Sequence, residues 1–113
     1  MSFQITFRDF PPSDAVRTHV EKHVEKLTSR FEAITSFKVV LEAPHHHKQH
    51  GNAFRARIDI VQPGDEIVIA SKDSEAGHTD LYAAIDDAFA SAERRLREAA
   101  RIRRGEIKSH AVG

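Results

Sequence analysis

The spacing of apolar residues changes along this chain, and this change constrains the fold more than any other sequence feature. Apolar and polar residues alternate over Phe3–Phe7, which is typical of a half-buried strand. From residue 14 to residue 31 the apolar residues instead recur every three to four positions, as in an amphipathic helix. Pro11–Pro12 separates the two patterns, and Ser13 or Asp14 can cap the helix. The chain therefore begins with a strand and a helix.

The rest of the chain repeats both patterns in a different order. Alternation predicts strands at residues 37–42, 54–60 and 67–71, and a second apolar stripe predicts a helix from about residue 80 to residue 104. The sequence from Gln62 to Asp65 is a tight turn built on Pro63-Gly64, so the last two strands form a hairpin. Thr79 or Asp80 can cap the second helix, and Gly105 can end it.

The predicted order β-α-β-β-β-α indicates an α+β fold. A crossover through the first helix makes the first two strands parallel, and the remaining strands add in antiparallel fashion. We expect a two-layer sandwich in which both helices pack on one face of a four-stranded mixed sheet. With 113 residues we expect one domain, residues 1–105, followed by a flexible C-terminal tail, residues 106–113.

The composition excludes several classes of protein. There is no cysteine, which excludes disulfides and thiolate sites and fits a reducing compartment. We see no secretory signal and no apolar run of the ~20 residues that a membrane span requires, so we expect a cytoplasmic protein. The common catalytic and phosphate-binding motifs do not occur, so we predict no enzyme activity, no small-molecule substrate, no cofactor and no metal.

The net charge is zero, from 17 basic and 17 acidic residues, but the charges are separated along the chain. Residues 1–90 include ten basic and fourteen acidic residues, whereas residues 91–113 include seven basic and three acidic residues. Six arginines and no lysine lie between positions 94 and 104. Basic residues near the C-terminal end of a helix complement the helix dipole, but this effect is confined to the last turn. Because the planar guanidinium group of arginine can donate two parallel hydrogen bonds to a phosphate, this segment indicates anion or nucleic-acid binding.

The first helix carries a second basic feature. Lys22, Lys26 and Arg30 form a row at i, i+4 and i+8, and His19 and His23 flank that row. Acidic residues occupy a neighbouring sector, so an ordinary solvated helix surface is an equally simple interpretation.

Four histidines fall between His45 and His50. Clustered imidazoles can bind Zn²⁺, but adjacent side chains diverge and no carboxylate or cysteine lies within the run. We therefore interpret it as a loop that becomes cationic below neutral pH rather than as a metal site.

The run from residue 80 to residue 86 resembles the signature of the ribosome hibernation-promoting factors, also described as sigma-54 modulation proteins. Similarity to this family extends over roughly residues 3–104, and the chain resembles the short form. It includes Pro63-Gly64 and the run from Glu93 to Arg97. The signature residues are Asp80, Tyr82, Ala84, Ile85 and Asp86.

The resemblance implies a β-α-β-β-β-α fold and a specific partner. Such proteins bind the small ribosomal subunit in the channel used by mRNA and tRNA, stop translation during starvation, and contact ribosomal RNA through basic helix residues. Lys22, Lys26 and Arg94 match basic positions of the family, and Arg101 and Arg104 extend the set along the helix. Our predicted RNA-binding residues are Lys22, Lys26, Arg30, Arg94, Arg95, Arg97, Arg101 and Arg104.

The chain also departs from the family. His23, Ser29 and Glu98 stand where basic residues are common, and Phe7 replaces a usual glycine. Fewer phosphate contacts predict a lower affinity and a shallower salt dependence.

Another hypothesis is a non-catalytic protein–protein interaction or regulatory module that uses the acidic helix surface and an open strand edge. In either case we expect a monomer in solution.

Overall fold

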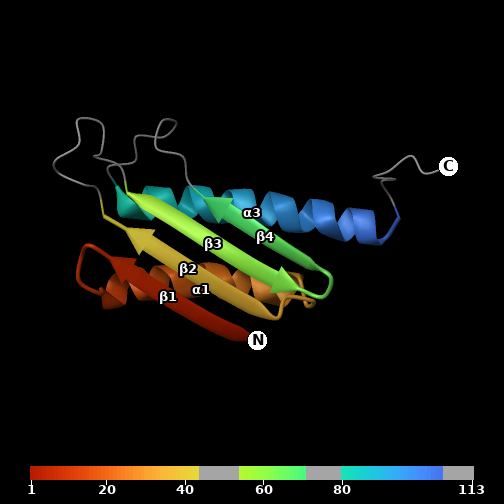
Figure 1. Ribbon diagram of the computed structural model, residues 1–113, viewed down its shortest axis with the longest axis horizontal. Coiled ribbons are helices and arrows are strands. Elements are labelled where there is room, and N and C mark those ends of the chain that lie inside the picture. The colour runs from red at the N-terminus through yellow and green to blue at the C-terminus, as the bar shows by residue number, and fades with distance from the viewer. Residues whose placement is uncertain (44–53, 71–79, 106–113) are drawn as a thin grey trace.

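The computed structural model describes residues 1–43, 54–70 and 80–105, and it has the predicted element order (Figure 1). The His45–His50 run and the expected tail at residues 106–113 lie outside these described residues. The elements are β1 (Ser2–Arg8), α1 (Asp14–Arg30), β2 (Ser36–Glu42), β3 (Arg55–Gln62), β4 (Asp65–Ala70) and α3 (Leu81–Arg103).

The four strands form one mixed sheet in the order β1-β2-β3-β4. β1 pairs with β2 in parallel, with Ile5 opposite Val39, and α1 makes the connection between them. β2 and β3 are antiparallel, with Val39 opposite Ile58, and β4 continues the antiparallel pairing. The predicted topology is confirmed.

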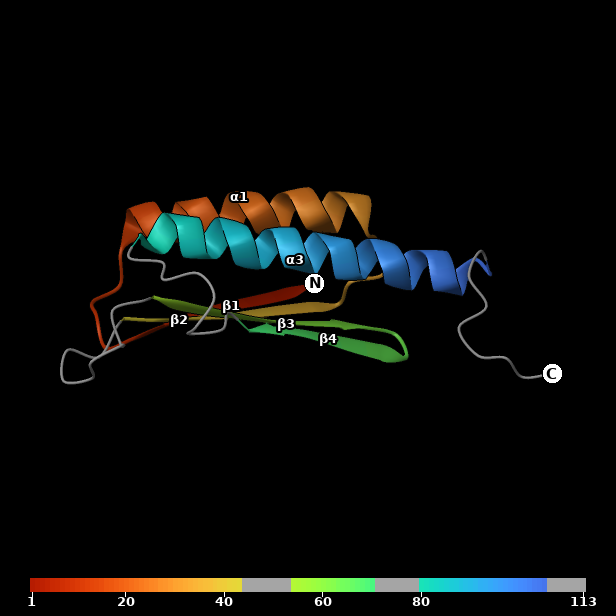
Figure 2. The same ribbon diagram turned by 90° about the horizontal axis from the view of Figure 1, so that it is seen from above.

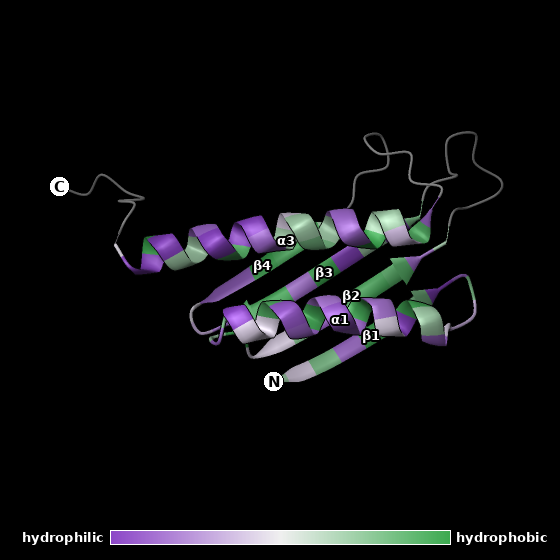
Figure 3. Cartoon of the chain, turned by 180° about the vertical axis from the view of Figure 1, so that it is seen from behind, coloured by the Kyte–Doolittle hydropathy of each residue, from purple (hydrophilic) through white to green (hydrophobic). Residues whose placement is uncertain are grey.

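Both helices cover the same face of the sheet, so the molecule has two layers (Figure 2). Alternate side chains of each strand point into the space between the layers, which is why the strands show period-two burial. In Figure 3 the helices lie in front of the sheet and hydrophilic and hydrophobic residues alternate along each of them; the hydrophobic residues include the buried stripes of α1 and α3. The most completely buried side chains are Phe37, Leu27, Leu41, Ile58, Ile60, Ile85, Leu96, Val20 and Val39.

Local sequence signals set the ends of the elements. The Ser13 Oγ accepts a hydrogen bond from the Val16 amide at 3.3 Å and caps α1. Gly105 follows α3 with φ +81°, and its amide donates to the Ile102 carbonyl at 2.9 Å. Gly64 has φ +76° in the turn between β3 and β4, a conformation that the second central residue of a type II turn requires.

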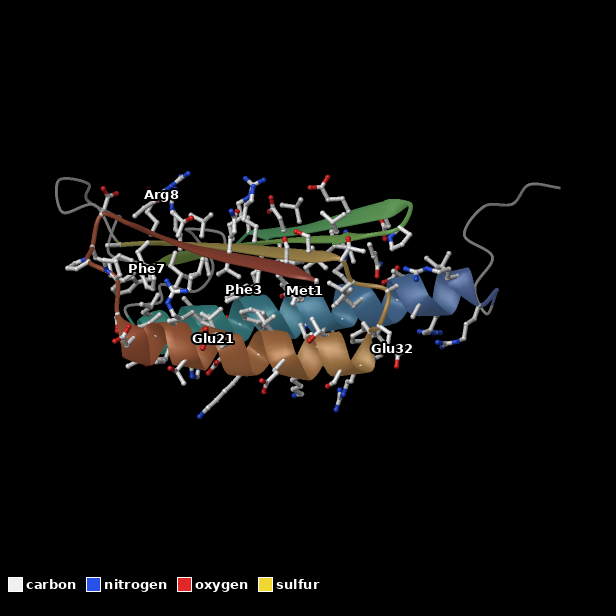
Figure 4. The ribbon with its side chains drawn as sticks, turned by 90° about the horizontal axis from the view of Figure 1, so that it is seen from below. Met1, Phe3, Phe7, Arg8, Glu21 and Glu32 are labelled. Carbon is white, nitrogen blue, oxygen red and sulfur yellow. The ribbon has the colours of Figure 1, made fainter. Side chains whose placement is uncertain are left out.

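The second face of the sheet is open to solvent. Figure 4 shows the side chain of Arg8 on this face and those of Phe3 and Phe7 directed toward the helices. Arg8, Glu42, Arg55 and Arg57 surround a shallow depression there.

Candidate nucleic-acid interface

The predicted basic row of α1 lies on the surface of the molecule. The buried stripe of this helix consists of Val16, Val20, Val24 and Leu27, so residues about half a turn away face outward. Lys22, Lys26 and Arg30 are all exposed, and Lys26 and Arg30 lie on the flank that faces α3. The i, i+4, i+8 spacing therefore gives one continuous row along the outer side of the helix layer.

The arginines of α3 do not share one direction. Arg97 faces α1, and Arg94 donates from Nη2 to the Ser91 Oγ at 3.0 Å. Arg95 lies on the opposite flank, beside Asp65 and Ile67 of β4. All of the predicted RNA-binding arginines of this helix are exposed, namely Arg94, Arg95, Arg97, Arg101 and Arg104.

Glu93 of α3 contacts basic residues of both helices. Its carboxylate accepts from Arg30 Nη1 at 2.6 Å and from Arg97 Nη2 at 2.9 Å, and Lys26 Nζ lies 4.0 Å away. The Glu93 side chain is only 18% exposed, whereas its three basic partners are more than half exposed. We call Glu93, Lys26, Arg30 and Arg97 the Glu93 cluster. One largely buried acid thus hydrogen-bonds two arginines and attracts a nearby lysine, while all three cations remain accessible to a ligand.

A second carboxylate of α3 contacts α1 two helical turns earlier. Asp86 Oδ1 lies 2.7 Å from His19 Nε2 and 2.8 Å from His23 Nε2. Burial raises the pKa of the Asp86 carboxyl, but the hydrogen bonds from His23 and His19 and the charge of the imidazoles outweigh it, so the pKa is lowered from its usual value. We call His19, His23 and Asp86 the histidine cluster. Its three side chains are potential ligands for a metal ion.

The rings around the histidine cluster are closely packed. His23 stacks on Phe89 with 4.6 Å between ring centroids and 8° between ring planes. His19 meets the ring of Tyr82 edge to face at 4.9 Å, and the two imidazoles are 5.2 Å apart. Tyr82 therefore packs against His19 of α1.

The five signature residues have separate structural roles. Asp80 Oδ1 accepts from the Tyr82 amide at 2.9 Å and caps α3. Ala84 and Ile85 have no exposed surface and pack in the core. Since Tyr82 and Asp86 contact α1, the signature both begins α3 and joins it to α1.

Two features of this surface escaped the sequence analysis. Glu93 was noted only as part of a family resemblance, His19 only as a neighbour of a basic row, and His23 as such a neighbour and as a departure from the family. One signal was available, because Asp86 and Glu93 are seven residues apart and so share a face of α3. The sequence does not show which flank of α1 meets that face.

Three hollows of the described surface are partly open to solvent, and the residues that line them include no serine, cysteine or histidine. No helix within residues 1–43 and 80–105 is long and apolar enough to span a membrane. The arrangement defines an α+β binding domain with exposed cations on its helix layer.

Comparison with known proteins identifies the family. Residues 3–104 match the family model described as sigma 54 modulation protein / S30EA ribosomal protein. The chain belongs to this family of ribosome-associated proteins, as its sequence predicted.

Two solved structures support the assignment of the fold. The N-terminal domain of protein Y from Thermus thermophilus is 29% identical, with a TM-score of 0.67 over 87% of this chain and 98% of that one. A ribosomal subunit interface protein from Coxiella burnetii is 18% identical, with a TM-score of 0.70 over 88% of this chain and 98% of that one, and shows the shared fold. No curated protein sequence matches the chain significantly.

Proposed function

We propose that this protein binds the small ribosomal subunit through the outer surface of α1 and α3 and inhibits translation. In this proposal the basic side chains contact phosphates of ribosomal RNA in the channel used by mRNA and tRNA, and the bound domain occludes both. Recognition depends on the shape of the RNA and the positions of its phosphates rather than on base sequence.

The observation that carries this proposal is the Glu93 cluster. Lys26 and Arg30 come from α1 and Arg97 comes from α3, yet one carboxylate hydrogen-bonds both arginines and lies 4.0 Å from the lysine. A cation held in place loses less conformational entropy when it binds a phosphate, so the cluster is prepared for a ligand with closely spaced negative charges. Lys22 and Arg94 extend the same surface.

The family relationship supports a ribosomal partner. The Coxiella burnetii neighbour is described as a ribosomal subunit interface protein, and we extend that role to this chain. Within the proposal the protein acts in the cytoplasm, as a monomer and without catalysis, on idle ribosomes.

Co-sedimentation in sucrose gradients tests the proposal. We expect the protein to travel with 30S subunits and 70S ribosomes at low salt and to dissociate as salt rises, because phosphate contacts release counterions. The variant Arg94→Glu with Arg97→Glu removes two exposed cations of α3, and we expect it to be released at both salt concentrations.

The matched control carries the same change of charge on the other face of the sheet. Lys38→Glu with Arg57→Glu replaces two exposed cations of β2 and β3, and we expect it to remain ribosome-bound. Circular dichroism establishes that both variants are folded. Absence of the wild-type protein from ribosomal fractions at low salt contradicts the proposal, whereas equal behaviour of the two variants contradicts the assignment of the surface.

The architecture also suggests a second candidate, a protein-binding module. β1 and β4 are the outer strands of the described sheet, and such edges can pair with a strand of another protein. This candidate predicts binding that does not require ribosomes and is unaffected by the α3 substitutions.

A further inference from the structure

The proposed ribosome binding assigns no role to the histidine cluster. Its two imidazoles come from α1, and its carboxylate comes from α3, 63 residues after His23. The three potential ligand atoms all lie within 4.8 Å of one another. Because a carboxylate oxygen only accepts hydrogen bonds, each imidazole presents Nε2–H to Asp86 in the metal-free protein.

The spacing of the two histidines suits metal chelation. Residues four apart lie on one face of a helix, and a pair of histidines at this spacing is a recurrent Zn²⁺-binding arrangement. Three protein ligands of the imidazole and carboxylate type, with a fourth position open, are typical of an accessible zinc site.

The distances require only a small rearrangement. Tetrahedral bonds of about 2.0–2.1 Å to zinc separate neighbouring ligand atoms by roughly 3.3 Å. The two Nε2 atoms are now 2.7 and 2.8 Å from Asp86 Oδ1, so the carboxylate must move away from the imidazoles by about half an ångström. The three ligand atoms lie within 4.8 Å of one another, so the two imidazole nitrogens must approach each other by no more than about 1.5 Å. Side-chain rotation supplies this movement, and each imidazole then carries its proton on Nδ1.

Surrounding residues hold the imidazoles near this geometry. The stacking of His23 on the buried ring of Phe89 and the contact of His19 with Tyr82 limit the positions of both rings. The His19 and His23 side chains are 31% and 27% exposed, so an ion from solvent can reach them. A site that is fixed on one side and open on the other can bind an ion without reorganising the backbone.

We propose that His19, His23 and Asp86 form a binding site for a divalent transition-metal ion of the zinc class, which joins α1 to α3. Imidazole nitrogens disfavour Mg²⁺ and Ca²⁺, which prefer oxygen ligands. The open fourth position lies on the outer side of the helix layer, where water completes the coordination. The proposal is independent of the ribosome, since it rests only on residues of this chain.

Calorimetry with Zn²⁺ tests the site in the full-length chain after treatment with a chelator. The other dense histidine run is first removed by the background substitutions His45→Gln, His46→Gln, His47→Gln and His50→Gln, so that it does not contribute. In this background we expect one saturable site. Zn²⁺ at a hundred times its dissociation constant is expected to raise the thermal midpoint by on the order of 10 °C.

Two variants locate the binding, and one serves as a matched control. We expect His23→Gln and Asp86→Asn each to lower the Zn²⁺ affinity at least about tenfold, since outer-shell changes alone have effects of this size. Asp87→Asn removes the same charge one residue along α3, where the side chain points about 100° away from that of Asp86 around the helix, and we expect wild-type affinity.

Two results would overturn the proposal. One is the absence of saturable Zn²⁺ binding in the background chain, and the other is unchanged affinity in both His23→Gln and Asp86→Asn. Neither measurement involves ribosomes, so failure here leaves the proposed ribosomal function untouched, and failure of that function leaves this site untouched.

Discussion

The Glu93 cluster and the histidine cluster are built in the same way and differ in one chemical respect. In each, a carboxylate of α3 receives side chains from α1, and the two acids are separated by two helical turns. Glu93 is 18% exposed and meets lysine and arginine, whose charge is permanent at neutral pH, whereas Asp86 is 55% exposed and meets imidazoles. One end of the interhelical contact therefore carries lysine and arginine cations, and the other carries imidazole and carboxylate groups that are potential metal ligands.

The largest expected difference between the clusters concerns ribosome binding. Lys26→Glu with Arg30→Glu reverses two exposed cations, and we expect the affinity for 30S subunits to fall by about 100-fold, because hydrogen bonds to charged groups contribute roughly 1.5 kcal/mol or more each. His19→Gln with His23→Gln is expected to change this affinity less than about threefold, because neither side chain belongs to the Glu93 cluster. Titration of labelled protein with 30S subunits at two salt concentrations measures the affinities of both double variants. Equal losses of affinity would show that the two clusters do not differ in ribosome binding.

A smaller effect is expected when the central acid of the Glu93 cluster is neutralised. Glu93→Gln loses two charge-assisted hydrogen bonds, and we expect the free energy of unfolding to fall by about 1 kcal/mol, since the basic partners are well solvated. Urea unfolding at low and high salt measures this. The difference from wild type should shrink at high salt, and a difference that persists there would mean that packing, rather than charge, carries the contribution.

The smallest effect is expected at Asp86 in the metal-free protein. The pKa of its carboxyl is below the ordinary value of 3.8, so the folded state favours the charged form. Its contribution to stability is therefore present above pH 3.8 and is lost as the pH falls through the lower pKa of the folded state. We expect wild type to exceed Asp86→Asn by less than about 1 kcal/mol near pH 5, because the site is exposed.

Urea unfolding between about pH 2 and pH 6 with a chelator present checks the sign of this effect. The two curves should converge in acid. A gap that widens as the pH falls below 3.8 would show that the carboxylate is not stabilised by its imidazole partners.

Most of the fold follows from local sequence. Alternation and helical spacing identify each strand and helix, and the caps at Ser13 and Asp80 and the glycine at residue 105 set helix ends. The strand bounds were less accurate. β3 and β4 extend to Gln62 and Asp65, which pair directly at the hairpin turn, because backbone pairing continues where the apolar alternation stops.

The candidate site was predictable only in part. The exposure of Lys22, Lys26 and Arg30 follows from the apolar stripe on the other side of α1, and the exposure of the α3 arginines follows in the same way. The contacts that these basic residues make with other elements do not follow from the apolar stripes. Nothing local to Arg30 indicates that it contacts an acid 63 residues away, and nothing local to Arg95 indicates that it lies beside β4 rather than α1.

The sequence by itself determined the elements, their order, the face that each helix buries and the exposure of the basic residues on the opposite face. Only the tertiary structure decided that Asp86 meets His19 and His23 and that Glu93 meets Lys26 and Arg30. The physical reason is that helical periodicity fixes directions around one axis. The relative rotation and shift of two helices are set by how their apolar stripes pack together on the sheet.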